Sequence, residues 1–298
     1  MAPRWLRALP LLALGTGLLG SVTPARALVP YVYVPQLQEL EGAGLGIAQA
    51  AARLLQMGQA EDAARLAALT VQLLPADPRG WVLLAEAQLR SQQLKGAAVS
   101  LARAKTLDPG NAGIWFAEGS LALRDGRPAE AVGLLEEGLK RDPRNASAYF
   151  DLGNAHILQG QTGQALKAFE RAARLRRDFW EAINNQALVL YEQGDPARAI
   201  EHWRRVLEIK PDAAEPNLAL AAALFPRGGA SREEALQRAG KALTTDPNYV
   251  LESYQQEQLW GPRLRRSTQL LLLQPELKAE VDRAQANANP DDDVQDDN

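Results

Sequence analysis

The sequence predicts an all-α fold, a right-handed superhelical α-solenoid of helical hairpins with capping helices at its C-terminal end. Three observations support this prediction. Ala is the commonest residue, with 52 copies among 298 residues, and only 6% of the residues are aromatic, a composition that favours helices. Prolines and small residues recur every 34 residues, a period typical of repeat architectures. Within each period, the apolar residues have helical spacing.

Residues 1–27 have the composition of a secretory signal peptide. A basic start, an apolar stretch and a cleavage motif follow one another: Arg4 and Arg7, Leu9 to Leu19, and Ala25-Arg26-Ala27. The apolar stretch is too short to cross a bilayer, which needs about twenty residues. We therefore expect export and a mature chain that begins at Leu28. The alternative is an uncleaved amphipathic anchor.

Residues 28–43 are expected to be extended. Pro30 and Pro35 flank the segment Tyr31-Val32-Tyr33-Val34, and proline lacks the amide hydrogen that an interior helical position requires. We expect this segment to pack on the first repeat or to lie along the groove of the array.

Six repeats fill residues 44–249. Prolines, with one arginine in their series, occupy position 32 of the repeats: Pro75, Pro109, Pro143, Arg177, Pro211 and Pro247. The repeats then begin at Gly44, Pro78, Ala112, Ala146, Trp180 and Ala214. Position 20 is alanine in all six repeats, and position 8 is always alanine or glycine. The sixth repeat has two extra residues near Pro226-Arg227-Gly228-Gly229, so we expect a looser hairpin there.

Each repeat is expected to form two helices packed as a hairpin. Positions 4, 8 and 11 share one face of a first helix, and positions 20, 24 and 27 share one face of a second helix. Small residues at positions 8 and 20 allow a close approach, and large residues at positions 4 and 24 fill the space beside them. Glycine at position 15 suits the left-handed end of the first helix, and proline at position 32 ends the second. One hairpin cannot bury both of its faces, so consecutive hairpins stack.

Residues 250–286 are expected to form capping helices, and residues 287–298 a disordered acidic tail. We expect helical stretches as far as Trp260, then from Arg263 to about Gln274, and from Pro275 to about Ala286. Atypical helices of this kind cover the open end of a solenoid. The tail consists largely of Asn, Asp and Pro, which bury too little apolar surface to fold.

The repeats resemble the tetratricopeptide repeat family. The fourth repeat shows the family pattern best, in Tyr149, Leu152, Gly153, Ala165, Phe169 and Ala172. The sequence departs from the pattern at Arg177, which replaces a proline, and at Asn217, which replaces an aromatic residue. The resemblance implies a concave groove, lined by the first helices, that binds a protein or peptide segment. The chain is also similar to exported cyanobacterial repeat proteins, which implies the periplasm or, in a photosynthetic source, the thylakoid lumen.

Composition and motifs argue against an enzyme. The chain has no Cys, which excludes disulfides, thiolate metal sites and a cysteine nucleophile, and it has only two His residues, His156 and His202. No phosphate-binding glycine loop, G-x-S-x-G motif or H-E-x-x-H motif occurs. A formal charge of −3 gives no basic footprint for nucleic acid. We expect no catalytic residue, cofactor or metal, and we expect His156 to be a buried, hydrogen-bonded residue of the helix interface.

The family resemblance assigns ligand contacts to positions 2, 5, 6, 9, 12 and 13 of the first helices, a stripe offset from the core stripe. The candidate partner-binding residues are Glu86, Arg90, Phe116, Arg124, Phe150, Asp151, Asn154, Asn184, Asn185, Leu188 and Tyr191. We expect the rings of Phe116, Phe150 and Tyr191 to anchor a partner segment. Asn154 and Asn185 are expected to bond its backbone. The alternative is that the three rings pack between adjacent first helices.

One function known for such grooves is rejected here, and one other surface competes with the groove. Relatives that capture C-terminal Glu-Glu-Val-Asp tails use two asparagines and three cations. Asn154 and Asn185 match the asparagines, but the cation slots hold Phe150, Glu215 and Ala219, and Glu215 would repel a carboxylate. The arginines between Arg171 and Arg177 are expected to be a solvated helix end, favourable near the C-terminal dipole, with a docking patch as the alternative.

The sequence therefore predicts a non-enzymatic scaffold that binds a partner segment in a concave groove. One alternative is an assembly factor for membrane protein complexes, such as photosystems. Another is a regulatory subunit of an envelope enzyme complex. The expected partner is a protein or peptide in each case, not a nucleic acid, and its identity and the oligomeric state of the chain stay open at this point.

Overall fold

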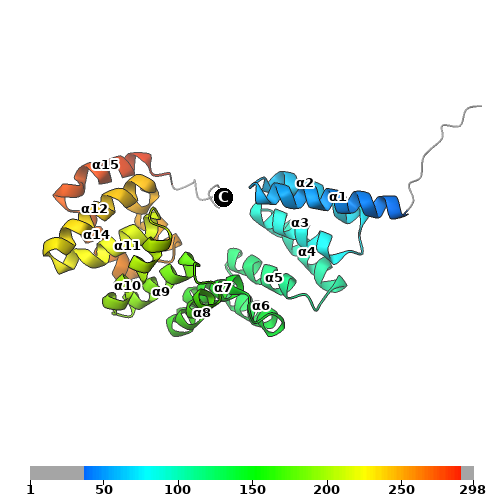
Figure 1. The fold of residues 1–298 in the computed structure, drawn as a ribbon, viewed down its shortest axis with the longest axis horizontal. Helices are drawn as coiled ribbons and strands as arrows, with labels where there is room; N and C mark the ends of the chain where they lie inside the picture. Colours follow the sequence, from blue (N-terminus) through cyan, green and yellow to red (C-terminus); the bar gives the residue numbers. More distant parts are fainter. Residues whose placement is uncertain (1–36, 290–298) are drawn as a thin grey trace, which may run out of the picture. The chain divides into compact units, whose positions relative to one another are not determined.

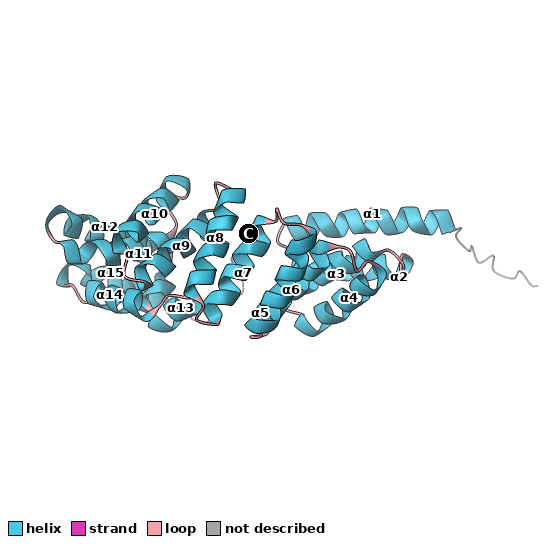
Figure 2. Cartoon of the chain, turned by 90° about the horizontal axis from the view of Figure 1, so that it is seen from below, coloured by secondary structure: helices cyan, strands magenta, loops and turns pink. Residues whose placement is uncertain are grey.

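The computed structural model describes residues 37–289, and within that range every regular element is a helix (Figures 1 and 2). The predicted signal peptide, the cleavage site before Leu28 and residues 290–298 of the predicted tail lie outside the described residues. Within residues 37–289, no helix combines the length and the apolar composition that a bilayer crossing requires.

Six helical hairpins follow one another along the described chain, and each hairpin packs against the next. The hairpins are α1 (Leu37–Gln56) with α2 (Ala60–Leu73), α3 (Pro78–Arg90) with α4 (Leu94–Leu107), α5 (Ala112–Arg124) with α6 (Pro128–Arg141), α7 (Ala146–Leu158) with α8 (Thr162–Leu175), α9 (Trp180–Glu192) with α10 (Pro196–Ile209), and α11 (Ala214–Leu224) with α12 (Gly229–Thr245). The all-α solenoid is confirmed. We call the side formed by α3, α5, α7, α9 and α11 the first-helix face.

Local sequence sets the ends of these helices. The first helices of repeats two to six begin at position 1 of the repeat. Asp77, Asn111 and Asn145 cap three of them, because each side chain accepts a backbone N–H near the helix start at 2.9 Å. The second helices end two residues before position 32, and α8 does so although Arg177 replaces the proline.

The small residues at positions 8 and 20 are the contact points of the hairpins. All six alanines at position 20 are completely buried. At position 8 of repeat four, a Cβ atom on Gly153 would lie only 2.4 Å from the Phe169 ring, so only glycine fits against this large residue. The predicted packing of large residues against the small residues of the hairpin is confirmed. Glycine has positive φ at four of the predicted turns, as for Gly126 at 68°, whereas Gln92 adopts this conformation in repeat two, with φ 58°.

Two expectations were wrong. Residues 37–43 are helical and not extended, because α1 begins at Leu37, after both of the prolines that suggested an extended segment. Extending an existing helix adds one hydrogen bond per residue, so the helix continues upstream of the repeat. The sixth hairpin is not looser than the others, because the short 3-10 turn η1 (Phe225–Arg227) takes up the insertion and Ala221 and Ala235 are completely buried.

The C-terminal elements cover both sides of the last repeats. They are η2 (Pro247–Val250), α13 (Glu252–Glu257), α14 (Pro262–Leu272), η3 (Pro275–Leu277) and α15 (Lys278–Asn287). α14 packs against α9 and α11 on the first-helix face, whereas α15 packs against α12 and η2 (Figure 1). Asn287 belongs to α15, and the Asn289 N–H donates to Asn248 Oδ1 at 2.9 Å, so residues 287–289 are ordered and not part of a disordered tail.

Candidate functional site

Polar side chains on the first-helix face bond one first helix to the next. Three hydrogen bonds make these connections: Arg124 Nη1 to the Leu89 carbonyl at 2.9 Å, Ser120 Oγ to Asp151 Oδ2 at 2.6 Å, and Asn185 Nδ2 to Asn154 Oδ1 at 3.0 Å. They join α3 to α5, α5 to α7, and α7 to α9. The predicted ligand-binding stripe therefore also holds consecutive repeats together.

Asp151 illustrates the electrostatics of this face. Burial raises the pKa of its carboxyl group, and the hydrogen bond from Ser120 and the charge of Arg124 oppose that rise. On α3, Glu86 and Arg90 form an ion pair at 2.9 Å, and both side chains are about half exposed. Acidic and basic groups thus alternate along the open part of the face, so it has no strong charge of one sign.

Asn154 and Asn185 form an amide pair that keeps hydrogen-bonding capacity. Both residues are half-buried. Their mutual bond uses one hydrogen of Asn185 and the oxygen of Asn154. Among residues 37–289, the Asn154 amide nitrogen has no hydrogen-bond partner, so it can donate to an incoming carbonyl. The structure therefore brings the two predicted asparagines together, although it also bonds them to each other.

The predicted aromatic anchors pack inward. Phe116 lies against α6, where a Cβ atom on Gly138 would approach its ring to 2.5 Å. The Phe150 ring centroid lies 5.8 Å from that of Phe169 and 5.1 Å from that of Phe179. Both rings are half-buried parts of the hairpin core. These two rings do not project as expected. They pack against the second helices of their own hairpins, α6 and α8, and not simply between adjacent first helices as the alternative had it.

Neighbouring helices, α14 among them, bury three of the four predicted contact residues of repeat five. Asn184, Leu188 and Tyr191 are 1%, 5% and 6% exposed. The Tyr191 hydroxyl hydrogen-bonds to Ser267 Oγ of α14 at 2.9 Å. Tyr191 and Asn184 are therefore engaged within the chain, and Leu188 borders the smaller of the two cavities described below. Sequence reasoning missed this because the repeat pattern ends before residue 250 and gives no direction for the helices that follow.

Glu192 fixes the start of α14. Its two carboxylate oxygens accept the backbone N–H groups of Arg263 and Leu264 at 3.1 and 2.8 Å. A carboxylate at a helix N-terminus is favourable, because it bonds the amides that have no partner within the helix and faces the positive end of the dipole. Glu192 stands at position 13 of repeat five, a ligand-contacting position in the family pattern, and the chain uses it for its own C-terminal segment.

Glu215 lies at the centre of a second connection to the C-terminal segment. Trp260 Nε1 donates to Glu215 Oε1 at 2.9 Å, and Trp203 Nε1 donates to Asn184 Oδ1 at 3.1 Å. Burial raises the pKa of Glu215 to about 7, although hydrogen bonds from Trp260 and Asn184 oppose the rise. Ala219 is completely buried. Glu215 and Ala219 stand at two of the three positions where relatives that capture C-terminal tails have cations. Both residues are therefore engaged inside this chain.

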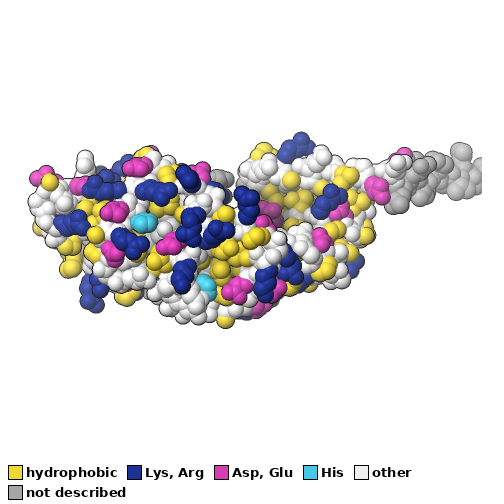
Figure 3. Space-filling view, turned by 60° about the horizontal axis from the view of Figure 1, so that its bottom comes forward, with side chains coloured by type: hydrophobic (Ala, Val, Ile, Leu, Met, Phe, Trp, Pro, Cys, Tyr) yellow, Lys and Arg dark blue, Asp and Glu magenta, His cyan; other side chains and the backbone are white. Residues whose placement is uncertain are grey.

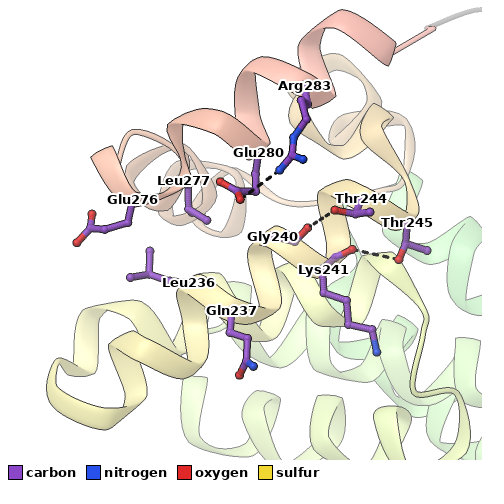
Figure 4. A pocket seen from close by; sticks show the side chains of 10 residues that line it. All are labelled: Leu236, Gln237, Gly240, Lys241, Thr244, Thr245, Glu276, Leu277, Glu280 and Arg283. Atoms are coloured by element: carbon purple, nitrogen blue, oxygen red, sulfur yellow. Dashed lines mark hydrogen bonds and ion pairs between the residues drawn. The ribbon is translucent and has the colours of Figure 1, made fainter.

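Two cavities lie beside the C-terminal segment. The larger, about 530 Å³, is an open hollow between α12 and α15 (Figure 4). Its polar groups serve their own helices: Arg283 pairs with Glu280, and the hydroxyls of Thr244 and Thr245 bond to backbone carbonyls one turn back. The smaller, about 230 Å³, adjoins the amide pair and is lined by Ile157, Thr162, Phe169, Asn185, Leu188, Val189, Glu192, Leu259, Gly261 and Pro262.

The arginine cluster at the end of α8 is largely engaged with neighbouring side chains. Lys and Arg side chains are frequent over the middle of the face shown in Figure 3, with hydrophobic side chains between them. Within the cluster, the Arg176 guanidinium lies 3.4 Å from the centre of the Phe179 ring, and Arg174 is 3.6 Å from Glu170. These contacts support the interpretation as a solvated helix end.

His156 is part of the helix interface. His156 is 5% exposed, and its Nδ1 lies 2.7 Å from Gln161 Oε1, which confirms a buried, hydrogen-bonded histidine. In residues 37–289, no three His, Asp or Glu side chains gather closely enough to hold a metal ion.

Comparisons with known proteins agree with this architecture. A tetratricopeptide repeat family profile matches residues 116–178, 155–214 and 184–247. A search of curated proteins finds no match. PilF of Pseudomonas aeruginosa superposes with a TM-score of 0.63 at 21% identity, over 74% of this chain and 98% of PilF. PilW, a type IV pilus biogenesis factor, has a TM-score of 0.57 at 19% identity, over 75% and 97% of the two chains.

A further solved structure, MamA of Desulfovibrio magneticus RS-1 from residue 41 to its end, has a TM-score of 0.51 at 20% identity over 59% of this chain and 98% of that chain. At these identities the likeness concerns the fold. The family profile shows that residues 116–247 are similar to tetratricopeptide repeats, and the six hairpins and the solved structures extend the likeness in fold to the other repeats. The profile matches cover repeats three to six most directly.

Proposed function

We propose that this chain is a non-enzymatic scaffold that binds an extended segment of a partner protein along α3, α5 and α7, up to the edge of α9. The observation that supports this most is the half-buried amide pair, Asn154 and Asn185, at the border where α14 begins to cover the face. Side-chain amides on adjacent helices offer donors and acceptors to a peptide backbone without selecting its sequence. The alternation of Glu86, Arg90, Arg124 and Asp151 favours a partner segment without a strong net charge.

The proposal replaces part of the predicted contact surface. Asn184 and Tyr191 are buried and hydrogen-bonded within the chain, and Leu188 borders the smaller cavity, so the backbone of the bound segment lies on repeats two to four and ends near Asn185. An assembly factor for membrane protein complexes and a regulatory subunit of an envelope enzyme are both scaffolds of this kind. The identity of the captured partner decides between them.

Affinity capture with matched variants tests the groove. The tagged full chain is expressed in its native host, and partners are quantified by mass spectrometry for the wild type and for the double variant Asn154→Ala, Asn185→Ala. Each lost backbone hydrogen bond weakens binding by about 0.5–1.5 kcal/mol, so we expect recovery of the true partner to fall roughly fivefold to a hundredfold. Gln164→Ala, which removes an exposed amide on α8, is the control and should leave capture unchanged.

A second variant tests the opposite surface. Arg171→Glu combined with Arg174→Glu reverses charge on α8, away from the amide pair. Capture that survives the double amide change but is lost on this charge reversal would show that the second-helix side binds the partner and that the groove assignment is wrong.

We also propose that the scaffold acts after export, in the periplasm or, in a photosynthetic source, the thylakoid lumen. The support is the signal-peptide pattern of residues 1–27. N-terminal sequencing of the protein from its native host should find Leu28 as the first residue. A chain that begins at Met1 or Ala2 would overturn both the compartment and the expected class of partner.

A further inference from the structure

We propose that the smaller cavity is a pocket for one large apolar side chain of the bound segment, a leucine, methionine or phenylalanine. This inference rests on the proposed function and names the chemistry of the partner. The cavity of about 230 Å³ lies between repeats four and five and the turn before α14. Ile157, Phe169, Leu188 and Val189 form its walls on the repeats, and Leu259 and Pro262 form its wall on the C-terminal segment.

The size of the cavity fits one side chain. Pockets for small molecules and cofactors have volumes of about 300–1,000 Å³, above the 230 Å³ found here. Voids left by ordinary packing are rarely larger than a water molecule, so the cavity exceeds a packing defect. Thr162 at its edge is exposed, which gives an entrance from solvent.

The electrostatics of the cavity favour an apolar occupant. Glu192 is the only ionisable residue among those that line it. Both carboxylate oxygens of Glu192 already accept backbone N–H groups of α14, at 3.1 and 2.8 Å. This carboxylate is therefore committed to the helix end and has little capacity left for a cationic ligand.

The cavity continues the proposed binding face. Asn185 belongs both to the amide pair and to the cavity lining. Ile157 follows Asn154 by three residues, and Leu188 follows Asn185 by three residues, so the cavity lies about one helical turn beyond the amide pair on the same two helices. A segment whose backbone bonds to the amides would place a neighbouring side chain at the entrance.

The pocket is composite, because the repeats alone do not close it. Leu259 has φ 61°, an uncommon conformation for a residue with a side chain, and it stands at the end of α13 with its N–H donated to the Gln256 carbonyl at 3.0 Å. Leucine in place of the usual glycine at such a helix end adds an apolar side chain to the wall of the cavity. The C-terminal segment thus both covers repeat five and completes the pocket.

Thr162→Phe tests the pocket, because it sets a ring at the entrance from an exposed position. Gly163→Phe is the matched control: it adds the same ring one residue later, where a Cβ atom would have no atom within 4 Å. A phage-displayed library of random twelve-residue peptides is selected on the wild-type full chain, and the enriched peptides are measured by fluorescence anisotropy. We expect a shared Leu, Met or Phe, at least tenfold weaker binding to Thr162→Phe, and unchanged binding to Gly163→Phe.

A direct probe keeps this test independent of the groove. Methyl NMR spectra of the full chain are recorded with N-acetyl-leucine methylamide and with N-acetyl-glutamate methylamide. The leucine probe should shift the methyl signals of Ile157, Leu188 and Val189 in the wild type and in Gly163→Phe, but not in Thr162→Phe. The glutamate probe should shift none of them.

The outcomes separate the two proposals. Peptides that lose affinity on Asn154→Ala, Asn185→Ala but bind Thr162→Phe normally would overturn the pocket and leave the groove standing. Absence of methyl shifts with the leucine probe also overturns the pocket. If the leucine probe shifts the methyl signals but no selected peptide loses affinity on Asn154→Ala, Asn185→Ala, the pocket proposal stands and the groove proposal is overturned.

Discussion

Helices α7 and α11 occupy the same place in repeats four and six, yet they have different surroundings. Five of the thirteen residues of α7 are buried, whereas ten of the eleven residues of α11 are buried. α14 packs on α11 but leaves α7 open. The repeat pattern sets where a first helix lies, and the elements outside the repeats decide whether its outer stripe is available to a partner.

The change from open to covered is visible in pairs of residues between neighbouring repeats. Position 9 of one first helix lies beside position 6 of the next, 31 residues later, in two hydrogen-bonded pairs. From repeat two to repeat six these pairs are Glu86 with Ala117, Ser120 with Asp151, Asn154 with Asn185, and Leu188 with Ala219. The last pair is apolar and belongs to the core cluster under α14. Two of the three pairs in the open part are therefore polar and hydrogen-bonded, whereas the covered pair is apolar.

The largest expected effect comes from removing the contact that fixes the C-terminal segment. Trp260 is 2% exposed, and its ring centroid lies 5.6 Å from that of Tyr249. Trp260→Ala should lower the free energy of unfolding by about 3–5 kcal/mol, the range for a large side chain lost from a core. Urea unfolding measures this, and hydrogen exchange should show α11 losing protection.

Trp115→Ala is the matched control in the open region. Trp115 is half-buried, donates to the Pro109 carbonyl at 3.2 Å and lies under Lys105. Trp115→Ala should lower the free energy of unfolding by less than Trp260→Ala does. It should also leave the hydrogen exchange of α11 unchanged, because the stability of a repeat array is largely the sum of the stabilities of single repeats and of the interfaces between neighbours. Equal deprotection of α11 in both variants would mean that α14 does not specifically stabilise repeat six.

In the covered region, Glu215 should make the stability of the chain depend on pH. Burial raises the pKa of Glu215 from an ordinary 4.5 to about 7. Between these pH values the folded chain holds the proton that the unfolded chain has released, so stability falls as the pH rises through this window. Glu215→Gln removes the buried charge and should add about 1–3 kcal/mol at pH 8 and almost nothing at pH 4, measured by urea unfolding at both pH values.

Glu208→Gln, on the exposed surface of α10, removes the same formal charge without removing a buried carboxyl group. It should leave the pH dependence close to that of the wild type. A Glu215→Gln variant with the wild-type loss of stability between pH 4.5 and 7 would assign the pH dependence to another group.

The hairpins were predictable from sequence because their information is local and repeated six times. Alanine at position 20 and the helix starts at position 1 depend on spacings within a few turns. The contact of Asn154 with Asn185 was also within reach, since residues at positions 9 and 6 of successive repeats become neighbours once the hairpins stack. The repeat period thus accounts for the fold and for the amide pair.

The burial of Tyr191 under α14 could not be predicted in the same way. Its partner Ser267 is 76 residues away, beyond the last repeat, where no period applies. One signal existed: α11 has an apolar run from Leu218 to Leu224 and so lacks the polar stripe of an open first helix. A helix that is apolar all round requires cover on every side, and α14 provides the missing side.

The smallest expected changes in stability come from two residues in the left-handed backbone conformation. One lies in the open region and the other in the covered region. Gln92 (φ 58°) is exposed at a turn of repeat two, and Leu259 (φ 61°) is half-buried at the cavity. Glycine relieves the conformational cost at either position, so Gln92→Gly should stabilise the chain by about 0.5–1 kcal/mol. Leu259→Gly gains the same relief but loses an apolar side chain, so its net effect should be a loss of about 1 kcal/mol.

The urea midpoints of the two variants show whether each change stabilises or destabilises the chain. Gly126→Ala gives a reference value for the conformational cost. Gly126 has φ 68°, and an added methyl group would meet no atom within 4 Å. This change therefore measures the conformational cost alone and should destabilise the chain by about 1 kcal/mol. If Leu259→Gly stabilises as much as Gln92→Gly, the Leu259 side chain contributes nothing to the packing of the C-terminal segment. In that case only α14, and not the turn that holds Leu259, would stabilise the covered region. The pocket would then lack the apolar wall that Leu259 is proposed to supply.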